Sequence, residues 1–161
     1  MLDGWQISGI ATFQSGPPRG VTVSLLSVTD LSGSPTESTR PILIAKPTIP
    51  RSEKTFSRQF NTAAFGPPQV GTPGNAAKDL FRGPGIHNWD VSLFKNFNVP
   101  EVKWRLQLRG EFYNAFNHTI FTGLDTAARF DAQGNQTNAR FGELLSSRGA
   151  RRVQIALRLT F

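Results

Sequence analysis

His87 and Asp90 are the residues of this sequence whose types and spacing come closest to a catalytic acid–base pair. They lie in the alternating stretch "IHNWDVSLF", and residues three apart on a strand point to opposite faces. No motif places a serine nucleophile beside them, and the chain contains no cysteine. We therefore expect no catalytic residue and no enzymatic activity.

Metal and cofactor sites are not indicated either. His118, the other histidine, follows the stretch "NAFN", and neither histidine stands in a cluster of carboxylates or cysteines that could complete a metal site. The stretches "GPPQVGTPG" and "RGPG" lack the lysine and the following helix of a phosphate-binding loop, so we interpret them as turns. We expect no metal and no cofactor.

Strands are the elements that must position these residues. Apolar and polar residues alternate near residues 4–14, 87–98, 102–117 and 151–161, and a period of two is typical of a strand whose two faces differ. Only Phe94 and Lys95 interrupt the alternation of the second segment. In the clearest segment the apolar positions are Val102, Trp104, Leu106, Leu108, Phe112 and Phe116, and the polar positions are Lys103, Arg105, Gln107, Arg109, Glu111 and Tyr113. The sequence therefore predicts an all-β protein with antiparallel strands.

The connections between these segments differ greatly in length. A tight turn near residues 99–101 joins the second and third segments, whereas residues 15–86 and 118–150 form long connections rich in Gly and Pro, with a short strand expected at "VTVSLL". Strands of about ten residues joined by short turns on one side and long loops on the other are typical of a transmembrane β-barrel. Aromatic residues expected at the membrane interfaces lie near strand ends: Trp5, Trp89 and Trp104.

A soluble antiparallel sheet is the alternative, because a sheet with one face on a core and the other in water shows the same alternation. The net charge of +7 would then favour an acidic partner such as nucleic acid. Sheets that bind single strands of nucleic acid usually combine aromatic and basic residues on one exposed face, whereas here the two kinds occupy mostly opposite faces. The long loops favour an open, curved part of a membrane barrel, and we expect no nucleic acid partner.

Five stretches carry a family resemblance: "GWQISGIATFQSGPP", "FNTAAFGPP", "GNAAKDLFRGPGIHNWDVSLFKNF", "RLQLRGEFYNAFNH" and "RRVQIALRLTF". In this order they resemble the C-terminal part of a TonB-dependent receptor of the Oar-like type, whose members often carry an N-terminal carboxypeptidase-regulatory-like domain. The resemblance covers nearly the whole chain, and residues 27–56 fit it least well. It implies a place in the bacterial outer membrane and import of an unknown small ligand, driven through TonB by the inner-membrane proton gradient.

The resemblance also implies that residues 1–161 are the C-terminal segment of a longer barrel. The start "MLDGWQISGIATFQSG" is not a signal peptide, and the plug domain, the TonB box and most of the about 22 strands of a plugged transporter are missing. The expected partners are outer-membrane lipid, the remainder of the barrel and plug, the barrel-assembly machinery, and TonB through the missing N-terminal part. The alternative is a truncated chain with no independent function.

Residue roles follow from the same resemblance. Outer-membrane barrels commonly end in an alternating strand whose last residue is Phe, which the assembly machinery reads, and here that residue is Phe161. The lipid-facing residues of the closing strand would be Val153, Ile155, Leu157 and Leu159. The basic residues expected on the lumen face are Lys103, Arg105, Arg109, Arg152 and Arg158. They would form either a wall that guides an anionic ligand or contacts the plug, or ordinary polar lining with Glu111 as a partner.

Overall fold

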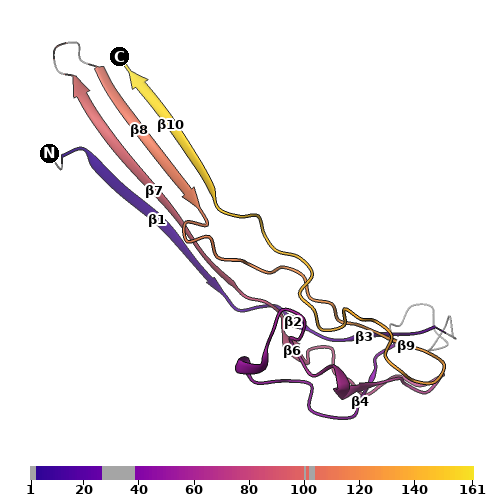
Figure 1. The fold of residues 1–161 in the computed structure, drawn as a ribbon. Helices are drawn as coiled ribbons and strands as arrows, with labels where there is room; N and C mark the ends of the chain where they lie inside the picture. The colour runs from indigo at the N-terminus through magenta and orange to yellow at the C-terminus, as the bar shows by residue number, and fades with distance from the viewer. Residues whose placement is uncertain (1–2, 27–38, 100, 102–103) are drawn as a thin grey trace. The chain divides into compact units, whose positions relative to one another are not determined.

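A four-stranded antiparallel sheet forms one of two compact units in the computed structural model (Figure 1), which describes residues 3–26, 39–99, 101 and 104–161. Its strands, in spatial order, are β1 (Trp5–Gln14), β7 (Ile86–Val99), β8 (Trp104–Tyr113) and β10 (Arg152–Thr160). The open, antiparallel, all-β architecture expected from the sequence is confirmed. Within the described residues, no helix has the length and apolar character needed to cross a membrane.

The register of the sheet keeps most of the apolar side chains on one face. Leu93 of β7 lies opposite Ile7 of β1 and Gly110 of β8, and Gly110 lies opposite Ile155 of β10. Because residues directly opposite each other in antiparallel strands share a face, these four residues form one transverse row. We call this the apolar face; it also carries Trp5, Trp89, Val91, Phe97, Trp104, Leu106, Leu108, Phe112, Val153, Leu157 and Leu159. The opposite, polar face carries Gln6, Ser8, Ser92, Asn96, Gln107, Glu111 and Gln154.

Two residues of β7 interrupt the alternation, and each has a local partner. Phe94 lies on the polar face opposite Arg109, whose guanidinium carbon is 5.0 Å from the centre of the Phe94 ring. Lys95 lies on the apolar face, where its Nζ donates a hydrogen bond to the carbonyl oxygen of Asp3 (2.6 Å) and lies 5.1 Å from the centre of the Trp5 ring. A lysine stem can follow an apolar surface while its ammonium reaches a polar group at the edge.

The third predicted strand is shorter than expected. It was predicted over residues 102–117, but β8 ends at Tyr113, and residues 102 and 103 lie outside the described part of the chain. Asn114 and Asn117 have φ angles of 54° and 52°, a left-handed conformation that asparagine tolerates and a strand does not contain. The Asn114 side chain accepts a hydrogen bond from the backbone N–H of His118 (2.9 Å) and donates one to its carbonyl oxygen (2.9 Å). Phe116 therefore belongs to a turn and not to the strand.

The two long connections leave the sheet at the same end, because Gln14 pairs with Ile86 and Tyr113 pairs with Arg152. We call this the loop end, and the opposite end, where β7 leads into β8, the turn end. Residues 15–84 and 121–147 form the second compact unit, the loop module. Its described elements are β2 (Pro18–Arg19), β3 (Thr22–Leu25), β4 (Ile42–Leu43), β5 (Phe65–Gly66), β6 (Phe81–Arg82), β9 (Ala127–Phe130) and the short 3-10 helices η1 (Arg51–Glu53) and η2 (Thr62–Ala64).

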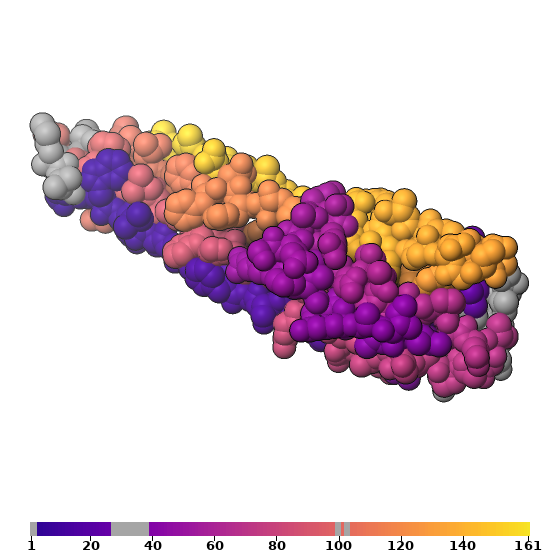
Figure 2. All heavy atoms as spheres, turned by 60° about the horizontal axis from the view of Figure 1, so that its bottom comes forward, coloured from indigo at the N-terminus to yellow at the C-terminus, as the bar shows by residue number. Residues whose placement is uncertain are grey.

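Pairing between strands from different loops joins the loop module together. β3, the short strand expected at "VTVSLL", runs parallel to β9 of the second loop. The backbone N–H of Thr22 donates a hydrogen bond to the carbonyl oxygen of Thr126, and that of Leu26 donates one to the carbonyl oxygen of Phe130. Both N–O distances are 3.0 Å. Figure 2 shows the second loop, in orange, packed against magenta segments of the first. The two connections are therefore one folded body.

Aromatic side chains form the core of the loop module. Phe60 is fully buried, and the centre of its ring lies 4.5 Å from that of Phe81, 5.1 Å from that of Phe141 and 5.8 Å from that of Phe65. The other buried members of this core are Val21, Ala64, Ala128 and Phe130. Burial of these side chains, more than its very short strands, accounts for the stability of the module.

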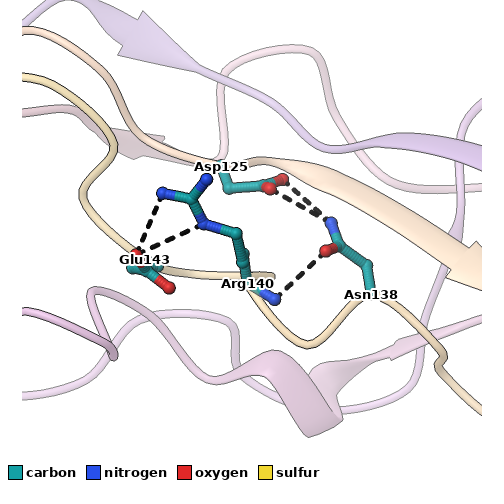
Figure 3. Close-up of polar contacts among 4 residues, drawn as sticks. All are labelled: Asp125, Asn138, Arg140 and Glu143. Atoms are coloured by element: carbon teal, nitrogen blue, oxygen red, sulfur yellow. Dashed lines mark hydrogen bonds and ion pairs between the residues drawn. The ribbon is translucent and has the colours of Figure 1, made fainter.

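A polar network organises the second loop (Figure 3). The Asn138 side-chain nitrogen donates hydrogen bonds to the two carboxylate oxygens of Asp125 (3.2 and 3.1 Å). It also donates one to the carbonyl oxygen of Ala127 (2.8 Å). Its side-chain oxygen accepts from the backbone N–H of Arg140 (3.1 Å), and the Arg140 guanidinium pairs with Glu143 (3.1 Å). This network fixes the start of β9 and hence the strand that joins the loops.

The turn after β9 gives a testable pH dependence. Hydrogen bonds from the side chain and the backbone of Asn135 hold the pKa of Asp131 below its ordinary value, because they favour the charged carboxylate. A carboxyl group whose pKa is lowered by folding stabilises the folded state above its unfolded pKa, and this contribution is lost as the pH falls through the folded pKa. We expect hydrogen-exchange protection of Gln133 and Asn135, corrected for intrinsic rates, to fall between about pH 5 and about pH 2. The Asp131→Asn variant should lose this dependence; unchanged protection in the parent over that range would contradict it.

Candidate functional site

The polar face of the sheet carries the basic residues singled out in the sequence. Arg105, Arg109, Arg152 and Arg158 all lie on it, and Lys103 lies outside the described residues. Arg109 forms an ion pair with Glu111, whose carboxylate also accepts a hydrogen bond from the Tyr113 hydroxyl (3.4 Å). Arg158 lies opposite Gln107, near the turn end. The four arginines are therefore spread along the face and do not form one cluster.

The apolar face stays exposed along the last strand. Val153, Ile155, Leu157 and Leu159 share it, and the side chain of Ile155 is 74% exposed. Phe161 directly follows β10 and is 93% exposed. Soluble monomers rarely expose a continuous apolar surface of this kind, so such a surface indicates contact with lipid or with another protein.

The three tryptophans lie at both ends of the apolar face. Trp5 is the first residue of β1 and Trp104 the first residue of β8, so both lie at the turn end. Trp89 lies near the loop end of β7, where its ring contacts Phe13 (5.5 Å between centres) and Phe116 (5.9 Å). Aromatic side chains therefore border the apolar face at each end.

A cavity of about 420 Å³ opens on the polar face near the loop end. Its walls are formed by Asn88, Asp90, Tyr113, Asn114, Ile120, Arg148, Gly149, Ala150 and Arg152. Ligand-binding clefts usually measure roughly 300–1,000 Å³ and combine apolar walls with a few fixed polar groups. The cavity is large enough for part of a small ligand, and all of its walls belong to the sheet unit.

Asp90 is the most firmly positioned polar group of this cavity. One of its carboxylate oxygens accepts hydrogen bonds from the backbone N–H of Asn114 (2.9 Å) and from the side-chain nitrogen of Asn88 (3.0 Å). Asn114 is itself buried and closes the turn that follows β8. The Asn88 side chain of β7 and the turn after β8 thus hold the carboxylate at the cavity wall.

Two guanidinium groups complete the polar wall. Neither Arg148 nor Arg152 forms an ion pair with a carboxylate among the described residues. The guanidinium carbon of Arg152 lies 5.9 Å from the centre of the Tyr113 ring, so the ring supports one face of the cation. The cavity can therefore offer two cationic donors to an anionic group, and one carboxylate to a hydroxyl or an amine.

Sequence reasoning found only part of this cavity. It placed Arg152 on the polar face, but it assigned no binding role to Asp90 and did not consider Arg148. His87 and Asp90 do lie on opposite faces, opposite Phe13 and Ile10 of β1. The signal that could have found the cavity is the alternation of faces along each strand. It places Asp90 and Arg152 on the same face, near the same end of the antiparallel sheet. The described residues contain no group of three or more His, Cys, Asp and Glu that could hold a metal ion.

The alternating sheet and its long loops agree with a comparison against protein families. A model described as "Outer membrane beta barrel domain" matches residues 1–154 of the 161. The chain belongs to this family of outer membrane beta barrel domains. The barrel domain therefore resides in the bacterial outer membrane, which decides against the soluble module. No curated protein matches the chain, and no solved structure matches it.

Proposed function

We propose that this barrel domain supplies C-terminal strands and extracellular loops of a TonB-dependent uptake receptor of the Oar-like type. The observation that carries the proposal is the polar cavity at the loop end, which is lined by a fixed carboxylate and by two arginines. The five sequence stretches that resemble this receptor type support it, since two of them contain most of β7 and β8, which contribute to the cavity. The folded loop module gives the long loops the constant shape that ligand recognition requires.

The proposal assigns the two faces of the sheet. The apolar face contacts lipid and the polar face lines the barrel interior, because charges are tolerated inside a barrel and are costly on its lipid side. Among the described residues, the outer edges of β1 and β10 have no strand partner. An unpaired sheet edge cannot persist in lipid, so further strands must pair with both edges. We propose the remainder of a longer barrel, with its plug, as the source of these strands.

The other proposed partners follow from this arrangement. TonB would act through the N-terminal part of the receptor, and the barrel-assembly machinery would contact β10 and Phe161. The tryptophans Trp5, Trp89 and Trp104 would lie at the two membrane interfaces. We propose no catalytic role and no nucleic acid partner for the barrel domain.

Uptake measurements test the proposed function directly. Accumulation of a ferric siderophore, cobalamin, an oligosaccharide and an oligopeptide would be measured in cells with and without TonB, and with and without the gene for this chain. We expect at least one of these probes to accumulate only when both TonB and the gene are present. Accumulation of all four independently of TonB or of the gene would contradict the proposal.

Arg152 should affect this uptake more than an arginine remote from the cavity. For the probe that passes the test above, Arg152→Gln should raise the half-saturating concentration by about tenfold or more, since a hydrogen bond to a charged group contributes about 1.5–3 kcal/mol. The matched control is Arg158→Gln, which removes the same charge from the same face near the turn end. Equal half-saturating concentrations for the two variants would show that the cavity does not bind the ligand.

A further inference from the structure

We propose that the loop end of the apolar face binds the phosphorylated headgroup of an outer-leaflet lipid. The site consists of an aromatic rim, defined as Phe13, His87, Trp89, Phe116 and His118, together with the guanidinium of Arg151. It lies on the opposite face of the sheet from the cavity, and it requires the membrane location of the barrel domain and the extracellular position that long loops generally have in such barrels. It is therefore independent of the proposed uptake function.

Ring contacts make the aromatic rim a continuous surface. The rings of His87 and His118 are stacked, with their centres 5.1 Å apart and an angle of 17° between their planes. The centre of the Phe13 ring lies 4.8 Å from that of His87, and the centre of the Phe116 ring lies 6.4 Å from that of His118. Phe13 and Phe116 are each 64% exposed, so the rim presents ring surface outward at the height where aromatic residues meet headgroups.

Hydrogen bonds orient a polar donor within this surface. The indole N–H of Trp89 donates a hydrogen bond to the Nε2 atom of His87, with a distance of 3.3 Å between the two nitrogens. The rim therefore combines polar ring nitrogens with apolar surface, a combination that suits the boundary between acyl chains and phosphate.

Arg151 supplies the positive charge. Its backbone N–H donates to the side-chain oxygen of Asn117 (3.0 Å), which fixes it beside the turn that carries Phe116. Its guanidinium lies 3.4 Å from the carbonyl oxygen of Ala115, the residue before Phe116. Among the described residues, Arg151 forms no ion pair with a carboxylate.

Charge complementarity identifies the occupant. In the described part of the sheet unit, Asp90 and Glu111 lie on the polar face, and Asp3 and Glu101 lie towards the turn end. The rim therefore has one cation beside it, and no described carboxylate of the sheet unit lies near it on the apolar face. A guanidinium held at the turn that carries Phe116 fits an anionic phosphate attached to acyl chains, because phosphate accepts charge-assisted hydrogen bonds and the chains cover the exposed rings.

Trp89 provides a direct reporter of occupancy. The signal of Trp89 would be obtained as the difference in fluorescence between the intact barrel that contains this chain and its Trp89→Phe variant. Both proteins would be folded in phosphatidylcholine bilayers and titrated with bisphosphorylated lipid A, with dephosphorylated lipid A, and with inorganic phosphate. We expect a saturable change of Trp89 fluorescence with the phosphorylated lipid only, and an apparent affinity about fivefold lower for Arg151→Gln.

Controls separate specific binding from partition into the bilayer. Arg158→Gln, at the turn end and on the polar face, should bind like the parent, and Arg151→Lys should retain most of the affinity. Heat-modifiable gel migration would establish that each variant is folded before titration. Equal responses to phosphorylated and dephosphorylated lipid, a saturable response to inorganic phosphate alone, or equal affinities of the parent and Arg151→Gln would overturn the proposal.

Discussion

Leu93→Arg is expected to remove most of the folded barrel domain from the outer membrane. Leu93 lies near the middle of β7 on the apolar face, between Ile7 and Gly110, so no side chain beside it can neutralise a charge. An arginine at the middle of the lipid-facing surface of a barrel costs about 2–4 kcal/mol. Lys95, two residues further along the same face, adds repulsion. The equilibrium constant for folding in the membrane should fall roughly 30-fold or more, and the heat-modifiable band in the outer-membrane fraction measures the resulting loss of folded protein.

Ser92→Arg is the matched control for Leu93→Arg. Ser92 is the preceding residue and lies on the polar face, opposite Ser8 and Glu111, so the same charge enters a polar environment with a carboxylate nearby. We expect the folded band of this variant to stay within about twofold of the parent, as surface substitutions usually change stability by less than 0.5 kcal/mol. Similar losses for the two variants would show that the lipid and lumen faces are assigned wrongly.

Phe60→Ala is expected to unfold the loop module while the strands remain in the membrane. Phe60 is fully buried and contacts the rings of Phe65, Phe81 and Phe141. Truncating a buried phenylalanine to alanine typically costs about 3–5 kcal/mol, through lost burial and the cavity that remains. A module with strands of two to four residues has little other structure to compensate. We expect proteases added to intact cells to cleave within residues 15–84 at least tenfold faster.

Phe56→Ala removes the same atoms from an exposed site and serves as the control. Its ring is 57% exposed and contacts Phe121 at 5.9 Å, outside the buried core. Cleavage of this variant should remain close to that of the parent, and the heat-modifiable band should be unchanged in both variants. If Phe60→Ala were no more sensitive to protease than Phe56→Ala, the loop module would not depend on this core.

The membrane strands could be predicted from the sequence because their signal is local. Alternation over ten residues reports that the two faces of a strand differ, and this placed β1, β7 and β10 to within one residue at each end. Propensity and alternation did not report where β8 ends. The alternation extends in the sequence to Phe116, but the left-handed conformation of Asn114 interrupts the strand first.

The loop module could not be predicted because its contacts are distant in the sequence. Phe60 packs against Phe81 and Phe141, and β3 pairs with β9, which lies about a hundred residues away along the chain. Apart from β3, the short strand expected at "VTVSLL", none of these residues belongs to a periodic segment. Long connections in a sequence therefore gave no indication that they fold together around one core.

The polar cavity was partly predictable. The alternation of side-chain direction along each strand places Asp90 and Arg152 on the polar face, and the antiparallel topology brings both near the loop end. Arg148, by contrast, precedes β10 in irregular backbone, where residue number does not determine the direction of a side chain. Asn114 lines the cavity because its left-handed backbone forms a turn at that point, which the alternation did not predict.

The central claim is that the sheet spans the outer membrane with its apolar face in lipid, and a spin-label scan of β10 tests it most directly. Because the chain has no cysteine, single cysteines can be introduced from Val153 to Leu159 in the membrane-embedded protein and labelled with a nitroxide. Collision rates would then be measured with oxygen, which partitions into lipid, and with a water-soluble nickel chelate. We predict oxygen maxima at Val153, Ile155, Leu157 and Leu159, and nickel maxima at Gln154, Ala156 and Arg158. A profile without this period of two, or one with the opposite phase, would contradict the account.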